Sequence, residues 1–243
     1  MCNTPTAGAK GRVSMHFEMV KKKLFDAGIA ELGFSDLRGV LPERYRRLPY
    51  GITLVYRLSN AVVDEILTYG EPGPTYSYFQ HYRAVNAALD QEALWLSTLI
   101  EREGYLALPI PASQSVKDMG HYSGAFQHKT AAVKAGLGWI GKSALFVSPK
   151  FGPRVRLATI LTDMPLPVEG DTPAPPGCKG CRICVDACPA RAIKGENYTP
   201  GAGRDVIFDP KACSEHMKKT YIHIGRGAVC GICMAACPFG KKN

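Results

Sequence analysis

The cysteines are distributed very unevenly along this chain of 243 residues. Cys2 stands alone in the first 177 residues, and the other eight cysteines all follow that point. Such grouping favours metal ligation by thiolates in a reducing compartment over disulfides spread through a fold. The start of the chain lacks the apolar run of a secretory signal, and no later window approaches the ~18 apolar residues of a membrane span. We therefore expect a soluble, cytoplasmic protein without membrane contact and with a metal site near its C-terminus.

The sequence CKGCRICVDACP, residues 178–189, spaces four cysteines in a way that is highly specific for iron–sulfur ligation. The spacing is C-x2-C-x2-C-x3-C followed by proline, as in bacterial ferredoxins. A second motif, CGICMAACP at residues 230–238, supplies three more cysteines and also ends in proline. Cys213 completes a set of eight, the number of ligands that two [4Fe–4S] clusters require. The predicted ligands are Cys178, Cys181, Cys184, Cys188, Cys213, Cys230, Cys233 and Cys237.

In two-cluster ferredoxins the fourth cysteine of each run ligates the other cluster. This crossing rule assigns Cys178, Cys181, Cys184 and Cys237 to one cluster, and Cys188, Cys213, Cys230 and Cys233 to the other. A zinc site is the alternative, but it would need four ligands in two separated pairs, and the triple spacing disfavours it. His216 and His223 lie nearby and are interpreted as non-ligands, because eight cysteines already suffice.

The net charge bears on the choice of partner. The formal charge of +9 would suit a polyanion such as nucleic acid. Each four-iron cluster with four thiolates carries about −2, however, so two clusters would leave about +5. No run of five like charges occurs. The charge therefore gives little support to nucleic-acid binding.

Apolar periodicity indicates a mixed α/β segment ahead of the cysteines. Residues 16–27 have helical spacing, and ITLVYRL at 52–58 is rich in strand formers. A long amphipathic helix is predicted from Tyr82 to Glu103, ended by Gly104, with the apolar stripe Val85, Leu89, Leu96, Leu99 and Ile100. FQHKTAAVKAG at 126–136 resembles a helix, whereas ALFV at 144–147 and RVRLATIL at 154–161 resemble strands. PLPVEGDTPAPPG at 165–177 contains five prolines and is predicted to be a linker.

The stretch AGLGWIGKSALFV, residues 135–147, matches two nucleotide-binding patterns, G-x-G-x-x-G and G-x-x-x-x-G-K-S. A phosphate-binding loop must follow a strand and open a helix, because the helix N-terminus and successive backbone N–H groups hold the phosphate. Here the predicted order is reversed, with a helix before Gly136 and strands after Lys142. The order disfavours a nucleotide site and suggests that Gly136 ends a helix as a left-handed cap.

Taken in order, these segments resemble the epoxyqueuosine reductase family and, more remotely, the corrinoid-dependent reductive dehalogenases. The matching segments cover residues 134–167, the cysteine run and its continuation at 178–193, the isolated Cys213, and residues 230–243. The predicted helix that follows His81 also resembles the helix ahead of the family's active-site segment. The order of these motifs makes the resemblance specific.

The resemblance implies an α+β fold: a nitroreductase-like α/β domain at residues 1–170 that binds a corrinoid, followed by a small two-[4Fe–4S] ferredoxin-like domain at 171–243. It also implies that a low-potential donor such as ferredoxin or flavodoxin supplies electrons, and that the clusters pass them to cobalamin. In the family the glycine stretch belongs to the corrinoid-holding domain. The implied cobalamin contacts are Gly136, Gly138, Trp139, Gly141 and Lys142.

Two departures from the family point to a different substrate. Epoxyqueuosine reductases carry an aspartate as proton donor seven residues before a basic residue, and seven residues before Lys129 stands Tyr122. A tyrosine donor is what the dehalogenases use, so Tyr122 is one candidate acid, with Asp118 and His121 as others. An aromatic residue with no proton role is the alternative for Tyr122. The family's Leu-Gly-Glu in the next strand is Leu157-Ala158-Thr159 here.

Three functions remain open from the sequence. The first is a cobalamin- and iron–sulfur-dependent reductase acting on a small molecule. The second is an electron-transfer protein or a reductase for the corrinoid of a partner protein. The third is epoxyqueuosine reduction on tRNA. We expect tRNA to be an unlikely substrate, because the sequence stops at Asn243, whereas epoxyqueuosine reductases continue into a helical-repeat region that helps to hold tRNA.

Overall fold

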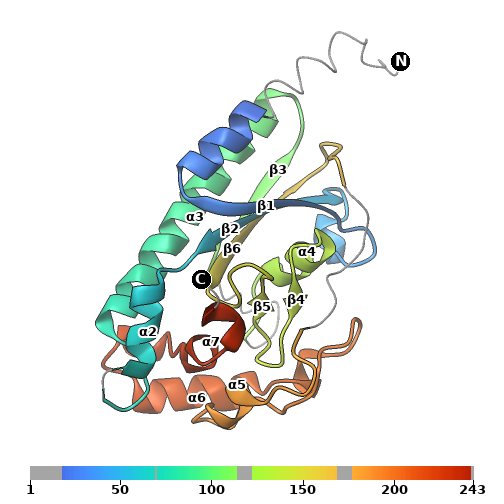
Figure 1. Cartoon of the computed structure of the whole chain (residues 1–243). Helices are drawn as coiled ribbons and strands as arrows, with labels where there is room; N and C mark the ends of the chain where they lie inside the picture. Colours follow the sequence, from blue (N-terminus) through green and yellow to red (C-terminus); the bar gives the residue numbers. More distant parts are fainter. Residues whose placement is uncertain (1–17, 69, 114–121, 169–176, 242–243) are drawn as a thin grey trace.

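The computed structural model describes residues 18–68, 70–113, 122–168 and 177–241 (Figure 1). Its centre is a four-stranded sheet in the order β1-β2-β6-β3, in which every neighbouring pair is antiparallel. The strands are β1 (Ile29–Asp36), β2 (Tyr50–Arg57), β3 (Ala107–Ile110) and β6 (Val155–Thr162). The strands expected at 52–58 and 154–161 are thus confirmed as β2 and β6. Pro109 lies in β3, at an edge of the sheet, where a residue without an N–H is tolerated.

Helices cover both faces of this sheet. Side chains alternate along a strand, so Leu54 of β2 packs with Leu89 of α3 (Tyr76–Arg102). The neighbouring Val55 faces the other way and packs with Ala132 of α4 (His128–Lys134). The 18–26 segment is helical, and α2 (Asn60–Thr68) lies beside α3 (Figure 1). This arrangement leaves the N-terminal end of α4 beside β6.

The predicted long helix is confirmed as α3, which starts six residues before the expected Tyr82. The hydroxyl of Thr75 caps it by accepting a hydrogen bond from the Tyr78 N–H at 3.0 Å. Four residues of its predicted stripe are buried, namely Val85, Leu89, Leu96 and Ile100. Gly104 follows its end with φ 86°, the left-handed conformation expected of a glycine there.

Short helices form the C-terminal part, at the bottom of Figure 1: α5 (Ile183–Asp186), α6 (Pro210–Thr220) and α7 (Ile232–Ala235). Single 3-10 turns are η1 (Glu43–Tyr45), η3 (Arg204–Val206), η4 (Gly225–Gly227) and η5 (Pro238–Lys241). Ile232 and Met234 of α7 belong to the same core cluster as Val63 and Ile66 of α2. Arg154, 1% exposed, donates to Asp64 at 2.7 Å and to the Ala235 carbonyl at 3.5 Å. The C-terminal part therefore shares one core with the sheet, and the boundary expected at residue 170 remains a prediction.

The glycine stretch ends one helix and does not begin another. Gly136 has φ 71° and donates to the Val133 carbonyl, while the Leu137 N–H reaches the Ala132 carbonyl, each at 3.0 Å. These two bonds form the Schellman cap of α4. The hairpin of β4 (Trp139–Ile140) and β5 (Phe146–Val147) follows. The helix-then-strand order inferred from the sequence is confirmed, and it is the reverse of a phosphate-binding loop.

Candidate functional site

The eight C-terminal cysteines carry free thiols that fall into two groups. Burial raises the pKa of Cys184 to about 11, and the nearby thiols of Cys237, Cys178 and Cys181 add to the shift. Burial likewise raises the pKa of Cys213 to about 11, with Cys230 and Cys188 contributing. The pKa of Cys233 is raised by burial and then chiefly by Cys230, Cys213 and Cys188. These neighbours agree with the two sets of four that the crossing rule proposes, with Cys184 also close enough to act on Cys233. The assignment of each set to one cluster stays a prediction.

Short helices explain why the sets cross. Cys188 follows α5 and Cys237 follows α7, and these two helices contact each other. Each run therefore ends beside the other run. Gly231 allows α7 to pack against α2, because a Cβ on it would lie 2.6 Å from the Ile66 Cδ1, and its φ is 84°.

A cavity of about 220 Å³ is lined by one complete set, Cys188, Cys213, Cys230 and Cys233, together with apolar side chains. Zinc would need four ligand atoms within about 2.3 Å of one point. Within the described residues, no three His, Cys, Asp or Glu side chains converge closely enough to hold a single metal ion. Thiols spread around a cavity suit a larger group, and a four-iron cluster is such a group.

Two buried ring nitrogens beside the thiols have no hydrogen-bond partner among the residues that the structure describes. His216 Nε2 lies on the wall of the thiol-lined cavity. Trp139 Nε1 belongs to a ring that packs on Gly177, the residue before Cys178, and on Phe239 at a centroid distance of 5.1 Å. Buried donors are normally satisfied. Cluster sulfurs at both positions would supply acceptors, so the residues present fit two iron–sulfur clusters.

A second cavity, of about 330 Å³, lies between α4, β6 and the C-terminal part. It is lined by small side chains such as Ser113, Gly124 and Ala144, and by three cationic residues. These are Lys129 from α4, Arg156 from β6 and Arg204 from η3. We call it the cationic cavity. Its volume suits a small molecule.

His128 lies in the wall of the cationic cavity and is held as a neutral ring. Burial lowers its pKa to about 4. Its Nε2 lies 2.9 Å from the Pro111 carbonyl, and a carbonyl only accepts, so Nε2 carries the proton. Nδ1 then accepts from the Thr159 hydroxyl at 3.0 Å. Thr159, one of the two departures noted in the sequence, therefore fixes the orientation of this histidine.

Lys129 is an unusually acidic lysine at the same site. Burial, together with the smaller effect of the nearby Arg204, lowers its pKa to about 8. Its Nζ donates to the Ala144 carbonyl at 3.0 Å. At neutral pH the lysine is thus mostly charged, close to the point at which it loses its proton.

Comparison with known proteins identifies the C-terminal part. The family model for a 4Fe-4S double cluster binding domain matches residues 177–240. This segment is a double-cluster iron–sulfur domain. Both cysteine groups lie inside it, and the thiol-lined cavity lies between this segment and earlier residues such as Tyr78 and Leu145.

About three fifths of the chain resembles two classes of enzyme in sequence. Over 157 residues it is 32% identical to a tetrachloroethene reductive dehalogenase of Sulfurospirillum multivorans, covering 62% of this chain and 28% of that protein. Over 160 residues it is 31% identical to an epoxyqueuosine reductase of Listeria monocytogenes, covering 62% of this chain and 37% of that protein. The chain therefore spans well under half the length of these relatives.

Solved structures support the fold. A catabolic reductive dehalogenase in complex with 3-bromo-4-hydroxybenzoic acid aligns with a TM-score of 0.68 at 19% identity, over 92% of this chain and 31% of that one. A selenomethionine-labelled epoxyqueuosine reductase aligns with a TM-score of 0.56 at 17% identity, over 95% and 67%. The mixed α/β fold with a C-terminal iron–sulfur domain is thus shared with both classes. The narrower nitroreductase-like description remains a prediction.

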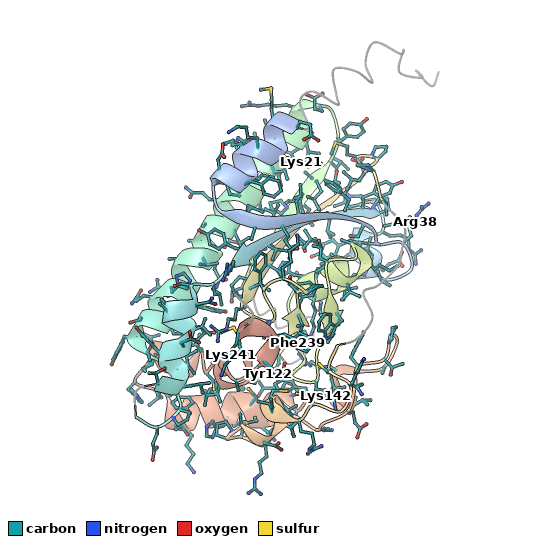
Figure 2. All side chains as sticks on the ribbon, in the orientation of Figure 1. Lys21, Arg38, Tyr122, Lys142, Phe239 and Lys241 are labelled. Atoms are coloured by element: carbon teal, nitrogen blue, oxygen red, sulfur yellow. The ribbon has the colours of Figure 1, made fainter. Side chains whose placement is uncertain are left out.

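Tyr122 is the one of the three predicted proton donors that falls within the described residues. Tyr122, labelled in Figure 2, lines the cationic cavity. Its backbone carbonyl accepts from Arg204 Nη1 at 2.9 Å. Its φ of 62° is uncommon for a residue with a side chain and is the kind of strain often found at functional sites. Asp118 and His121 lie outside the described residues. The role of Tyr122 as an acid stays a prediction.

The predicted corrinoid contacts have a structural role of their own. Gly138 packs inside the β4–β5 hairpin, where a Cβ would lie 2.1 Å from the Val147 carbonyl oxygen. A Cβ on Gly141 would lie 2.9 Å from Val147 Cγ2 and 3.5 Å from Cys178 Sγ. Lys142 and Trp139 are buried, and Gly136 caps α4. None of the five lines either cavity, so their contact with cobalamin remains a prediction.

Sequence reasoning missed Arg156 and Arg204. Arg156 lies in a predicted strand, and a charged residue between the apolar Val155 and Leu157 is the sequence feature that could have marked it as functional. It donates from Nε to Asn86 at 2.9 Å and from Nη2 to the Ala112 carbonyl at 3.0 Å. Arg204 lies in the long segment between the cysteine motifs, where no local pattern distinguishes it. Only the fold brings it to the cavity.

Proposed function

We propose that this chain is an oxidoreductase that takes up electrons in its double-cluster domain and delivers them to a corrinoid at the cationic cavity, where a small non-tRNA molecule is reduced. One observation carries the proposal. The thiol-lined cavity and the cationic cavity share a wall, formed by Leu145, Pro153, Val155 and Arg156. An electron entering at the thiols would therefore be one layer of side chains from the ligand.

The clusters would supply one-electron transfer, and the corrinoid would supply a strongly reducing cobalt. The side chains of the protein would orient the ligand, exclude water and supply protons. Leu145, Pro153 and Val155 exclude water from the shared wall. Tyr122 would hold a proton at its phenol oxygen. Lys129 and Arg204 would hold acidic groups of the ligand.

The cationic residues of the cavity would hold acidic groups of a corrinoid. His128 is the one histidine among the described lining residues, and both of its ring nitrogens are already hydrogen-bonded. The cationic side chains suit a phosphate such as that of the cobalamin nucleotide tail. At about 330 Å³, the cavity holds a small molecule or one edge of a corrinoid.

Anaerobic titration of the reconstituted protein with cobalamin tests this function. We expect saturable binding and a visible spectrum of the form without an axial base, with iron content unchanged. ATP and NADH at the same concentrations should not bind, because the glycine stretch caps a helix. Absence of cobalamin binding in protein that retains its iron would contradict the proposal and favour an electron-transfer role with a partner protein.

A further inference from the structure

Three segments far apart in the sequence bring positive charge to one cavity. Lys129, Arg156 and Arg204 all line the cationic cavity, and no described lining residue is an aspartate or glutamate. His128 adds no charge, because burial keeps its pKa near 4. The described wall therefore carries three cations and no anion.

A buried cation elsewhere in this protein has a carboxylate partner: Arg154, 1% exposed, pairs with Asp64 at 2.7 Å. No ion pair found among the described residues includes Lys129, Arg156 or Arg204. Like charges that approach one another away from bulk water cost free energy, and a bound anion would remove that cost.

Hydrogen-bond donors also remain for a ligand. A guanidinium group has five N–H donors, and the described contacts of Arg204 use one of them, on the Tyr122 carbonyl. An ammonium group has three, and those of Lys129 use one, on the Ala144 carbonyl. Both contacts are to backbone oxygens, so they hold the side chains in place without neutralising them.

We propose that the cationic cavity binds the carboxylate or phosphate group of its ligand between Lys129 and Arg204, which makes the double-cluster domain a determinant of substrate specificity. The inference deepens the proposed function, because it takes this cavity as the reducing site. Arg204 lies in η3, between the two cysteine motifs. The domain that carries electrons would thus also select an anionic substrate.

Binding of benzoate and of its neutral isostere benzamide to reconstituted protein tests the inference without turnover. We expect benzoate to bind in calorimetry and benzamide to bind at least tenfold more weakly. Arg204→Gln should weaken benzoate binding about 10–100-fold, the range for a charge-assisted hydrogen bond lost from a partly buried site. Lys219→Gln is the control, since Lys219 is an exposed cation of the same domain outside both cysteine motifs, and it should leave the affinity unchanged.

The pH dependence gives a second measurement. Among the residues that the structure describes, the ionisable groups that line the cavity with Lys129 are Arg204, Arg156, His128 and Tyr122. The arginines stay charged and His128 stays neutral. Because the pKa of Lys129 is about 8, benzoate affinity should be constant between pH 6 and 7 and should fall up to about tenfold per unit above 8. Lys129→Met should bind benzoate weakly at every pH and lose this dependence.

A parallel titration distinguishes the two sources of anion. Cobinamide lacks the nucleotide tail and its phosphate. If Arg204→Gln weakens cobalamin binding and spares both cobinamide and benzoate, the anion belongs to the corrinoid, and the substrate part of the inference is overturned. Equal affinity for benzoate and benzamide, or an unaffected Arg204→Gln, overturns the inference altogether. Failure to bind cobalamin with benzoate recognition intact would refute the proposed function alone.

Discussion

Replacing Cys213 with serine is expected to lower the iron content after anaerobic reconstitution from about eight to about four atoms per chain, because each four-iron cluster needs four thiolates. Cys213 stands apart from both motifs in the sequence, but its thiol lies among Cys230 and Cys188. Iron and acid-labile sulfide assays measure the loss. Electron paramagnetic resonance of the reduced protein should show that the set ending in Cys237 keeps its cluster.

Cys2→Ser is the control for this experiment, because Cys2 lies outside both cysteine groups in the sequence. It should retain all the iron. If Cys213→Ser also retained about eight iron atoms, the ligand assignment would be wrong and another residue near the thiol-lined cavity would complete the second site. His216 would be the first to substitute next, because its buried Nε2 lies in that wall without a partner.

Replacing Tyr122 with phenylalanine is expected to leave iron content and cobalamin affinity unchanged but to lower turnover of a substrate that the wild-type protein reduces. A positioned general acid commonly contributes ~10²–10⁴-fold to rate. The phenol O–H of tyrosine can donate a proton, whereas a phenylalanine ring has no such donor. The control is Tyr105→Phe, since Tyr105 is also exposed and does not line the cationic cavity.

Other outcomes of the Tyr122 experiment have defined meanings. Full activity in Tyr122→Phe would show that Tyr122 is not the acid, and Asp118→Asn and His121→Gln would be tested next. If Tyr122 is the acid, these two variants should lower turnover less than Tyr122→Phe does. Loss of cobalamin affinity in Tyr122→Phe would show that the ring shapes the cavity. In that case the source of the proton would have to be sought elsewhere.

Local patterns in the sequence predicted the parts of the structure that depend on local chemistry. The stripe of α3 follows from helical periodicity, and Gly136 follows from the need for a left-handed cap. The two cysteine groups follow from the geometry of ferredoxin-type runs, in which spacing limits the thiols that can share a cluster. The helix stripe and the cap need no knowledge of distant residues, whereas the cysteine groups join both motifs and follow from the crossing rule of two-cluster ferredoxins.

Features that depend on distant partners were not predicted. β1 escaped detection because its buried face includes Glu31 and Ser35. Glu31 accepts a hydrogen bond from Ser148 at 2.9 Å, across 117 positions of sequence. A carboxylate is stable inside only with such partners, and a single sequence does not reveal them. The same reason hides Arg204, whose contact with Tyr122 spans 82 positions.

The glycine stretch shows how one residue pattern can serve several structures. Its spacing matches loops that cradle phosphate, and the family resemblance assigns it to a corrinoid domain. In this fold Gly138 is required because the carbonyl of Val147 leaves no room for a Cβ. A glycine spacing motif indicates that something comes close to the backbone. Whether this is a ligand or another part of the protein depends on the helices and strands on either side of the motif.

Reductive titration of the cobalamin-loaded protein tests most directly the claim that the double-cluster domain delivers electrons to the cationic cavity. With titanium(III) citrate as reductant and the visible spectrum as readout, bound cobalt in the wild-type protein should be reduced after the clusters. In Cys213→Ser loaded with the same amount of cobalamin, this reduction should be at least tenfold slower. Equal rates in the two proteins, or cobalt that stays oxidised while both clusters are reduced, would contradict the account.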